Sequence, residues 1–225
     1  MKKKILLIGG SSKVGKSLIN VLDKKKYDVH STYFSKKLKK NYVKQYKLDI
    51  NDLSDQNILI KSTKNMNIIF FLSGVLMGKK LSQFNDDEIY TNFNTNFTSQ
   101  VVLLKKILGK QKRNCLLIFL SSISGRKGSY DPVYASSKAA MIALVKSISK
   151  WEAPKIKCIG ICPGLIKDTK IFNIFKENRL KKLLLENPNK EFVSSEDLAN
   201  ILADLIKPHW RHANGSIIDI NGGVF

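Results

Sequence analysis

The chain has 225 residues, of which 39 are Lys or Arg and 18 are Asp or Glu, which gives a formal net charge of +21 at pH 7. Its hydrophobic content of 43% is that of a globular protein and excludes a disordered chain. No apolar run approaches the ~20 residues that span a membrane, and the length suits a single α/β domain, a class that reaches ~250 residues.

Along the chain, short apolar runs alternate with stretches of helical spacing. Apolar runs predict strands at residues 5–8, 67–72 and 114–120. Further strands are expected at residues 27–33, which are rich in β-forming residues, and at residues 42–48, 157–161 and 216–220. Helical spacing predicts helices at residues 14–22, 53–63, 86–108, 134–151 and 196–206, the last with Ser194 or Ser195 as N-cap. This alternation predicts βαβ crossovers. We therefore expect one doubly wound Rossmann domain over residues 1–225, α/β in class, with a mainly parallel central sheet and helices on both faces.

The charge is carried by lysines spread along the whole chain, with few arginines. Surfaces that read bases or fork phosphates favour arginine and concentrate it. We therefore favour a solvated lysine surface over specific nucleic-acid binding and expect only nonspecific adhesion to polyanions.

Targeting and metal signals are weak. Met1 and the lysines after it resemble the head of an export signal, but residues 5–8 form a shorter apolar core than the ~7–15 residues of such signals. We expect a cytoplasmic protein that binds no membrane. The three cysteines, Cys115, Cys158 and Cys162, form no CxxC pair and are expected to be buried free thiols. We expect no metal site.

A glycine-rich segment, residues 9–15, separates the first strand from the first helix. A helix N-terminus offers free N–H groups and partial positive charge to a pyrophosphate, and glycines let the backbone approach it. The segment predicts a nucleotide site.

A tyrosine and a lysine, Tyr134 and Lys138, stand four apart in a predicted helix and so share one face. A cation beside a tyrosine favours the phenolate and makes the side chain a better proton donor and acceptor near neutral pH. Such a pair is common on helix surfaces. Together with the glycine segment and with Ser122, which stands directly after a strand, the pair forms a combination that is no longer common.

In this order, the motifs resemble those of the short-chain dehydrogenase/reductase superfamily. The resemblance covers the chain from Gly9 to the closing Asn221-Gly222-Gly223, which is similar to the 3-oxoacyl-carrier-protein reductase branch. It implies that Tyr134 protonates a carbonyl oxygen, that Ser122 hydrogen-bonds the same oxygen, and that Lys138 binds the nicotinamide ribose and lowers the tyrosine pKa. It also implies that Asn96 holds a water that links Lys138 to solvent.

The same resemblance implies a cofactor site along the ends of several strands. Asp49 would receive the adenine edge, and Pro163-Gly164 would pass beside the nicotinamide. The residues expected at the cofactor are Gly9, Ser11, Ser12, Lys13, Val14, Gly15, Ser35, Lys36, Asp49, Ile50, Gly74, Tyr134, Lys138, Pro163, Gly164 and Ile166.

Several positions depart from the family pattern. The usual Asn-Asn-Ala-Gly is here residues 71–74, Phe-Leu-Ser-Gly, so the amides that support the sheet and the cofactor are missing. The middle glycine of the phosphate loop is Lys13, as in pteridine-reductase-like members that use NADPH. The threonine expected soon after Pro163-Gly164 is shifted to Thr169.

The cofactor preference is predicted from residues 29–40, which contain no acid. NAD-specific sites place an Asp or Glu after the second strand, on the ribose 2′-hydroxyl. Ser35 instead offers a hydrogen-bond donor, and Lys36 a positive charge, to a ribose 2′-phosphate. Lys13, in the phosphate loop, would contact the same phosphate from its other side. We expect NADP(H) to be preferred over NAD(H).

The leading interpretation is an NAD(P)H-dependent oxidoreductase that reduces a small-molecule carbonyl. The alternatives are a nucleotide-sugar-modifying enzyme of the same superfamily, which usually has a longer C-terminal domain, and a non-catalytic NADP(H)-sensing protein. Residues 165–190 are expected to form a substrate lid. Relatives are commonly homodimers or homotetramers, and the resemblance implies the same here.

Overall fold

The computed structural model describes residues 1–225. All seven strands are parallel and form one sheet, in the order β3-β2-β1-β4-β5-β6-β7. The strands are β1 (Lys3–Ile8), β2 (Tyr27–Tyr33), β3 (Lys44–Lys47), β4 (Ile68–Phe71), β5 (Cys115–Leu120), β6 (Ile156–Pro163) and β7 (Ile217–Ile220).

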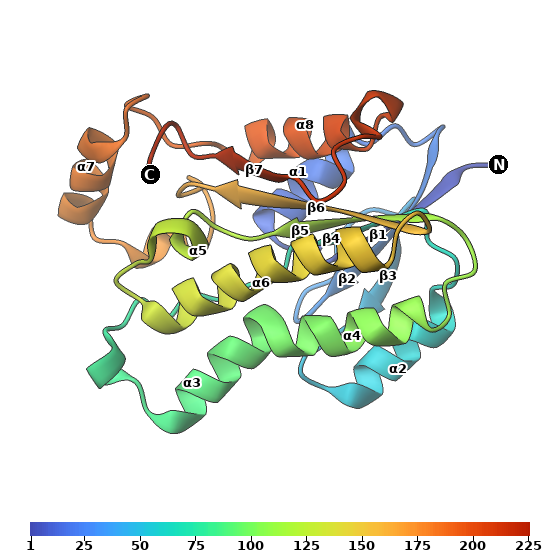
Figure 1. Cartoon of the computed structure of the whole chain (residues 1–225), viewed down its shortest axis with the longest axis horizontal. Coiled ribbons are helices and arrows are strands. Elements are labelled where there is room, and N and C mark those ends of the chain that lie inside the picture. Colours follow the sequence, from blue (N-terminus) through green and yellow to red (C-terminus); the bar gives the residue numbers. More distant parts are fainter.

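Helices cover both faces of the sheet (Figure 1). The helices are α1 (Lys13–Val21), α2 (Leu53–Ser62), α3 (Asp86–Phe93), α4 (Ser99–Leu108), α5 (Ser124–Lys127), α6 (Pro132–Trp151), α7 (Glu177–Glu186) and α8 (Ser195–Leu205). Short turns are η1 (Leu81–Gln83), η3 (Phe172–Ile174) and η4 (Pro208–Trp210), with a π-helical turn η2 (Asn94–Thr98). α1 and α8 pack on one face, and α2, α4 and α6 pack on the other.

The core explains why the central strands read as unbroken apolar runs. In β1, Leu6 and Ile8 join the cluster under α2, α4 and α6, while Ile5 and Leu7 join the cluster under α1 and α8. Successive side chains of a strand point to opposite faces, so a strand covered on both sides must be apolar at every position.

Strand order reverses between β1 and β4, which pair directly with Ile5 opposite Ile68. In open α/β sheets, ligands bind outside the carboxyl ends of the strands at such a switch point. In Figure 1, β6 and β7 point toward the end of the molecule that carries α5 and α7, so the loops that could form a site lie there.

The predicted fold class is confirmed, and all seven predicted strands are present. The predicted N-cap Ser194 caps α8 by accepting from the Asp197 N–H. The single helix expected over residues 86–108 is instead divided into α3, η2 and α4. The three cysteines are free and buried, as predicted. None of the helices is both long and apolar enough to cross a membrane.

Candidate active site

The glycines of the loop between β1 and α1 are required by close packing. Gly9 has φ +84°, and a Cβ there would lie 2.7 Å from Ser73 Oγ and 2.9 Å from Ser73 N. A Cβ on Gly15 would lie 2.5 Å from the Gly10 Cα. The loop therefore packs on itself and on the loop after β4 so tightly that only glycine fits.

The first turn of α1 keeps free hydrogen-bond donors. Ser12 is the N-cap, and its Oγ accepts from the Gly15 N–H at 3.1 Å. The Ser11 N–H donates to the Thr32 carbonyl at 3.2 Å, but the N–H groups of Lys13 and Val14 donate to no protein acceptor. Two free donors at the positive end of a helix, in a glycine cradle at the switch point, fit the pyrophosphate of a dinucleotide.

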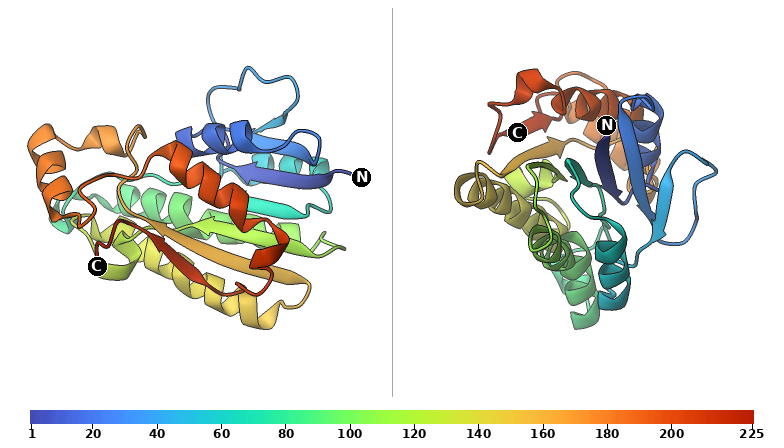
Figure 2. Two further views of the ribbon diagram at one scale, coloured as in Figure 1. Left: turned by 90° about the horizontal axis from the view of Figure 1, so that it is seen from above. Right: turned by 90° about the vertical axis from the view of Figure 1, so that its right-hand side faces the viewer.

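The residues expected at the adenine end lie on separate loops. Ser35 and Lys36 are exposed on the loop of residues 34–43, which projects from the body of the molecule (Figure 2). Asp49 follows β3, and its Oδ1 accepts from the Asn51 N–H at 3.0 Å. Ile50 is buried, and its carbonyl accepts from Gln56 Nε2 at 2.8 Å. Neither Ser35 nor Lys36 has a side-chain partner.

The N-terminus of α6 positions Tyr134 and Lys138. Pro132 begins the helix, and Asp131 caps it by accepting from the Tyr134 N–H at 2.9 Å. Tyr134 therefore lies in the first turn, with Lys138 on the same face one turn later. Both side chains are buried.

Ser122 lies in the turn after β5, beside this pair. Its Oγ accepts from the Ser124 N–H at 3.1 Å, and its side chain lies close enough to the Tyr134 phenol to lower the pKa of that group. A Cβ on Gly125 would lie 2.6 Å from the Lys138 carbonyl carbon, so the turn abuts α6 without a gap. The structure thus brings Ser122, Tyr134 and Lys138 together.

Lys138 also meets Gly74 and Asn96. A Cβ on Gly74 would lie 3.2 Å from Lys138 Nζ and 3.2 Å from Asn96 Oδ1, so these two side chains flank the glycine. Lys138 Nζ donates to the Leu120 carbonyl at 3.0 Å. Asn96 is 0% exposed in the π-helical turn η2, and it both accepts from the Val75 N–H and donates to the Val75 carbonyl, each at 2.8 Å. Asn96 thus holds the loop after β4 against Lys138.

Burial dominates the electrostatics of the pair. It raises the pKa of Tyr134 to about 12, with Asp131 and Cys162 acting in the same direction and Ser122 in the opposite one. It lowers the pKa of Lys138 to about 8. The sequence led us to expect that Lys138 lowers the tyrosine pKa. In the structure, Lys138 Nζ lies 5.6 Å from the centroid of the Tyr134 ring and donates to the Leu120 carbonyl, so this effect of Lys138 stays a prediction.

Two residues that the sequence interpretation missed support the site. Asp131 is buried, and its second oxygen accepts from the Gly78 N–H at 2.9 Å, which ties the loop after β4 to α6. Gln100 Nε2 donates to the carbonyls of Ser73, Thr95 and Asn96, each at 3.1 Å. It supplies an amide beside the segment that lacks the usual asparagines. An Asp before Pro at a helix start was a recognisable capping signal, whereas Gln100 had none.

The loop after β6 forms the remaining wall. A Cβ on Gly164 would lie 3.2 Å from the Asn221 Cα, and the Ile166 carbonyl accepts from Thr169 Oγ1 at 2.8 Å. The Pro163 carbonyl accepts from the Ile123 N–H at 3.0 Å, which joins this loop to the turn of Ser122. Ile174 Cγ2 lies 3.3 Å from a Cβ placed on Gly78, so the segment leading to α7 approaches the loop after β4.

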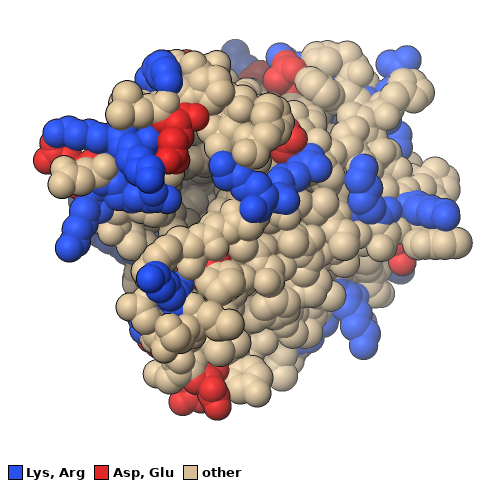
Figure 3. All heavy atoms as spheres, turned by 60° about the vertical axis from the view of Figure 1, so that its left-hand side comes forward, with Lys and Arg blue, Asp and Glu red and all other residues tan.

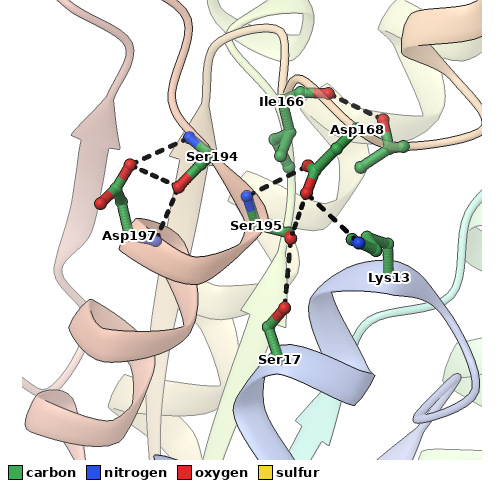
Figure 4. Close-up of polar contacts among 8 residues, drawn as sticks. Lys13, Ser17, Ile166, Asp168, Ser194, Ser195 and Asp197 are labelled. Atoms are coloured by element: carbon green, nitrogen blue, oxygen red, sulfur yellow. Dashed lines mark hydrogen bonds and ion pairs between the residues drawn. The ribbon is translucent and has the colours of Figure 1, made fainter.

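The Lys13 side chain does not lie where the sequence analysis predicted it. Its Nζ lies 3.6 Å from Asp168 Oδ2, in the loop after β6, and no contact joins it to the loop after β2 (Figure 4). In the structure the side chain extends toward the β6 side of the phosphate loop, and its assignment to the 2′-phosphate stays a prediction.

Basic side chains crowd over α7, beside a hollow in this face of the molecule (Figure 3). Residues 165–190 hold seven basic and three acidic residues. Lys181 and Lys182 pair with glutamates of α7 itself, whereas Lys170, Lys176 and Arg179 have no acidic partner.

Comparisons with known proteins agree with this geometry. A family model described as short chain dehydrogenase matches residues 3–179. The chain is 26% identical over 242 residues to the 3-oxoacyl-[acyl-carrier-protein] reductase FabG of Buchnera aphidicola, covering 100% of this chain and 98% of that protein. FabG of Staphylococcus epidermidis is 22% identical, with 100% of both chains covered. The crystal structure of a short-chain dehydrogenase/reductase (glucose/ribitol dehydrogenase) from Brucella melitensis superposes with a TM-score of 0.91 at 19% identity, covering 100% and 99% of the two chains.

Proposed function

The chain belongs to the short-chain dehydrogenase family and is an oxidoreductase of the class that acts on CH–OH or carbonyl groups, and we propose that it reduces a carbonyl to an alcohol with NADPH. The observation that carries the proposal is the meeting of Ser122, Tyr134 and Lys138 beside a phosphate loop with free donors. The intact trio also favours catalysis over a purely sensing role.

The residues divide the work of the reaction. NADPH, when bound, supplies the hydride. The Ser122 hydroxyl donates a hydrogen bond to the substrate oxygen and stabilises the negative charge that develops there. The Tyr134 phenol, which is protonated at neutral pH, donates its proton to the same oxygen. Lys138, held by the Leu120 carbonyl, places a cation beside the tyrosine as it loses its proton. Asn96 fixes the loop after β4 next to Lys138 and, as proposed, orders a water on the proton path.

Replacing Tyr134 with Phe tests this mechanism. The ring volume is nearly unchanged, so the fold and NADPH binding should persist while turnover falls by about 10²–10⁴-fold, the range for a general acid. Turnover and calorimetric NADPH binding are measured side by side. Tyr27→Phe, at the amino end of β2 far from the trio, is the matched control and should leave turnover unchanged. Near-normal turnover in Tyr134→Phe would reject the mechanism.

We propose that NADPH is preferred over NADH because the loop after β2 carries exposed Ser35 and Lys36 and no acid. A carboxylate at this place would repel a 2′-phosphate. Lys36→Glu should therefore shift the ratio of kcat/KM for NADPH and NADH toward NADH by at least about tenfold, which is ~1.4 kcal/mol. Lys112→Glu, an equal change of charge on the loop before β5, should leave the ratio unchanged. A wild-type enzyme that uses both cofactors equally would contradict the preference.

The proposed substrate is a 3-oxoacyl thioester presented by an acidic carrier. Two features support it: the names of the FabG relatives, and the unpaired Lys170, Lys176 and Arg179 on the proposed lid of residues 165–190. A panel of acyl thioesters, pterins, sugars and simple ketones decides the substrate class, and the highest kcat/KM is expected for a carrier-bound 3-oxoacyl group.

We also propose a homodimer or homotetramer. The neighbouring helices α3 and α6 expose the aromatic side chains of Tyr90 and Trp151, which a second copy would cover. Light scattering measures the molar mass in solution, and a monomer at all concentrations would contradict this proposal.

A further inference from the structure

A lysine and an aspartate form an ion pair at the edge of the phosphate loop. Lys13 lies in the first turn of α1, where the backbone N–H groups of Lys13 and Val14 are free, and its Nζ lies 3.6 Å from Asp168 Oδ2. Figure 4 shows the pair between the start of α1 and the start of α8. The Asp168 carboxylate at the rim of an anion site would repel the anion, so its position there needs an explanation.

Asp168 is held firmly in this position. Its oxygens accept from the Ser195 N–H at 3.3 Å and from Ser195 Oγ at 2.9 Å, and Ser195 Oγ in turn contacts Ser17 Oγ at 3.1 Å. Its φ of +64° is a conformation that few non-glycine residues adopt, though Asp and Asn adopt it more readily than most. The carboxylate is therefore fixed on α8, whatever Lys13 does.

Lys13, by contrast, is free to leave. Its side chain is 51% exposed on a flexible stem, and Asp168 is its sole acidic partner. Exposed pairs of this kind contribute little net free energy. A ligand that brings two negative charges to the N-terminus of α1 offers the ammonium a stronger partner.

We propose that Asp168 is a counter-ion that pairs with Lys13 in the free protein. When a nicotinamide dinucleotide binds, Lys13 leaves Asp168 and binds the pyrophosphate of the cofactor. This inference rests on the proposed function and adds a residue that sets cofactor affinity. Both NADPH and NADH contain the pyrophosphate, so Asp168 weakens the binding of both alike, and the choice between them stays with the loop after β2.

A double-mutant cycle with calorimetry tests the proposal without turnover. NADPH and NADH are titrated into the wild type, Asp168→Asn, Lys13→Ala and the double variant. Asn keeps an acceptor for Ser195 and tolerates the backbone conformation. Asp168→Asn should tighten both cofactors about three- to tenfold and Lys13→Ala should weaken both by a similar factor. In the Lys13→Ala background, the gain from Asp168→Asn should fall below about twofold.

Asp23→Asn is the matched control. It changes the net charge equally and breaks an exposed pair of similar length, Lys26 to Asp23 at 3.7 Å, and it should leave both dissociation constants unchanged. Circular dichroism and thermal unfolding confirm that each variant folds.

Three results would overturn the proposal: unchanged dissociation constants in Asp168→Asn, a change for NADPH alone, or a gain of the same size in the Lys13→Ala background. A wild type that binds neither cofactor would instead reject the proposed function itself, and this inference with it.

Discussion

Tyr134 keeps its proton in this structure because burial and a nearby carboxylate both disfavour the phenolate. The groups that face the phenol are Ser122, Asp131, Cys162 and, beyond the ring, Lys138. Burial has the largest effect and raises the pKa of Tyr134 to about 12. Such a group carries the proton that reduction needs, but it is a weak acid, and a positive charge near the phenol would make it a better donor and acceptor by lowering its pKa.

Asp131 therefore has a positional and an electrostatic role, and Asp131→Asn removes the charge while it keeps the cap. The amide oxygen can still accept from the Tyr134 N–H, although the second acceptor for the Gly78 N–H is lost. The amide no longer opposes the phenolate, so the pKa of Tyr134 falls. A general acid must be protonated, so the rate of reduction falls as pH rises through that pKa. In Asp131→Asn, the alkaline fall of kcat/KM should begin at lower pH, with activity at neutral pH within about tenfold of wild type.

The measurement is a pH profile of kcat/KM. Asp87→Asn, which removes an exposed carboxylate from the first turn of α3, is the control and should not move the profile. An alkaline limb that stays in place in Asp131→Asn would show that the aspartate acts through position alone.

Among the elements, the loop between β1 and α1 tolerates the least change. A Cβ on Gly15 would lie 2.5 Å from the Gly10 Cα and 2.6 Å from the Gly10 carbonyl oxygen, and both of these are backbone atoms that cannot rotate away. Overpacking of this kind costs about 1–3 kcal/mol. We expect Gly15→Ala to lower the free energy of unfolding by that amount and to weaken NADPH binding at least about tenfold.

Urea denaturation and NADPH titration check this prediction. Gly109→Ala, at the end of α4, is the control, because a Cβ there would make only ordinary contacts of 3.6 Å and 3.7 Å. Equal stability of the two variants would mean that the phosphate loop is less tightly packed than the structure shows.

Elements dominated by local pattern were predictable from the sequence. The central strands β1, β4 and β5 are covered on both faces and are apolar along most of their length, and the trio of Ser122, Tyr134 and Lys138 follows from a strand end and a helical spacing. The π-helical turn had no signal in the local pattern, and Asn96 within it hydrogen-bonds to Val75, 21 residues away. The same holds for Lys13, whose partner Asp168 is brought to it by the packing of α8 beside α1. Periodicity carries no information about such pairs.

Over the whole molecule, the charge of +21 is spread rather than gathered into one stripe. Lysines lie on exposed positions of both the phosphate-loop end and the opposite end of the sheet, and most ion pairs are exposed and so weak. A dispersed surface of this kind contacts only a few phosphates of a duplex at one time. Around the hollow in Figure 3, however, basic side chains gather, and they would raise the local concentration of the acidic cofactor and carrier that we propose.

The last prediction concerns this surface. We expect weak binding to any duplex DNA, with equal affinity for two unrelated sequences of the same length. Binding releases counterions, so three or four phosphate contacts should cost roughly 40–150-fold in affinity between 50 and 200 mM salt. Fluorescence anisotropy at several salt concentrations gives both the slope and the comparison of sequences. NADPH binding should fall far less over the same range, because its phosphates meet backbone donors as well as lysines. Tight binding to one sequence at 200 mM salt would mean that the lysines form a specific nucleic-acid site.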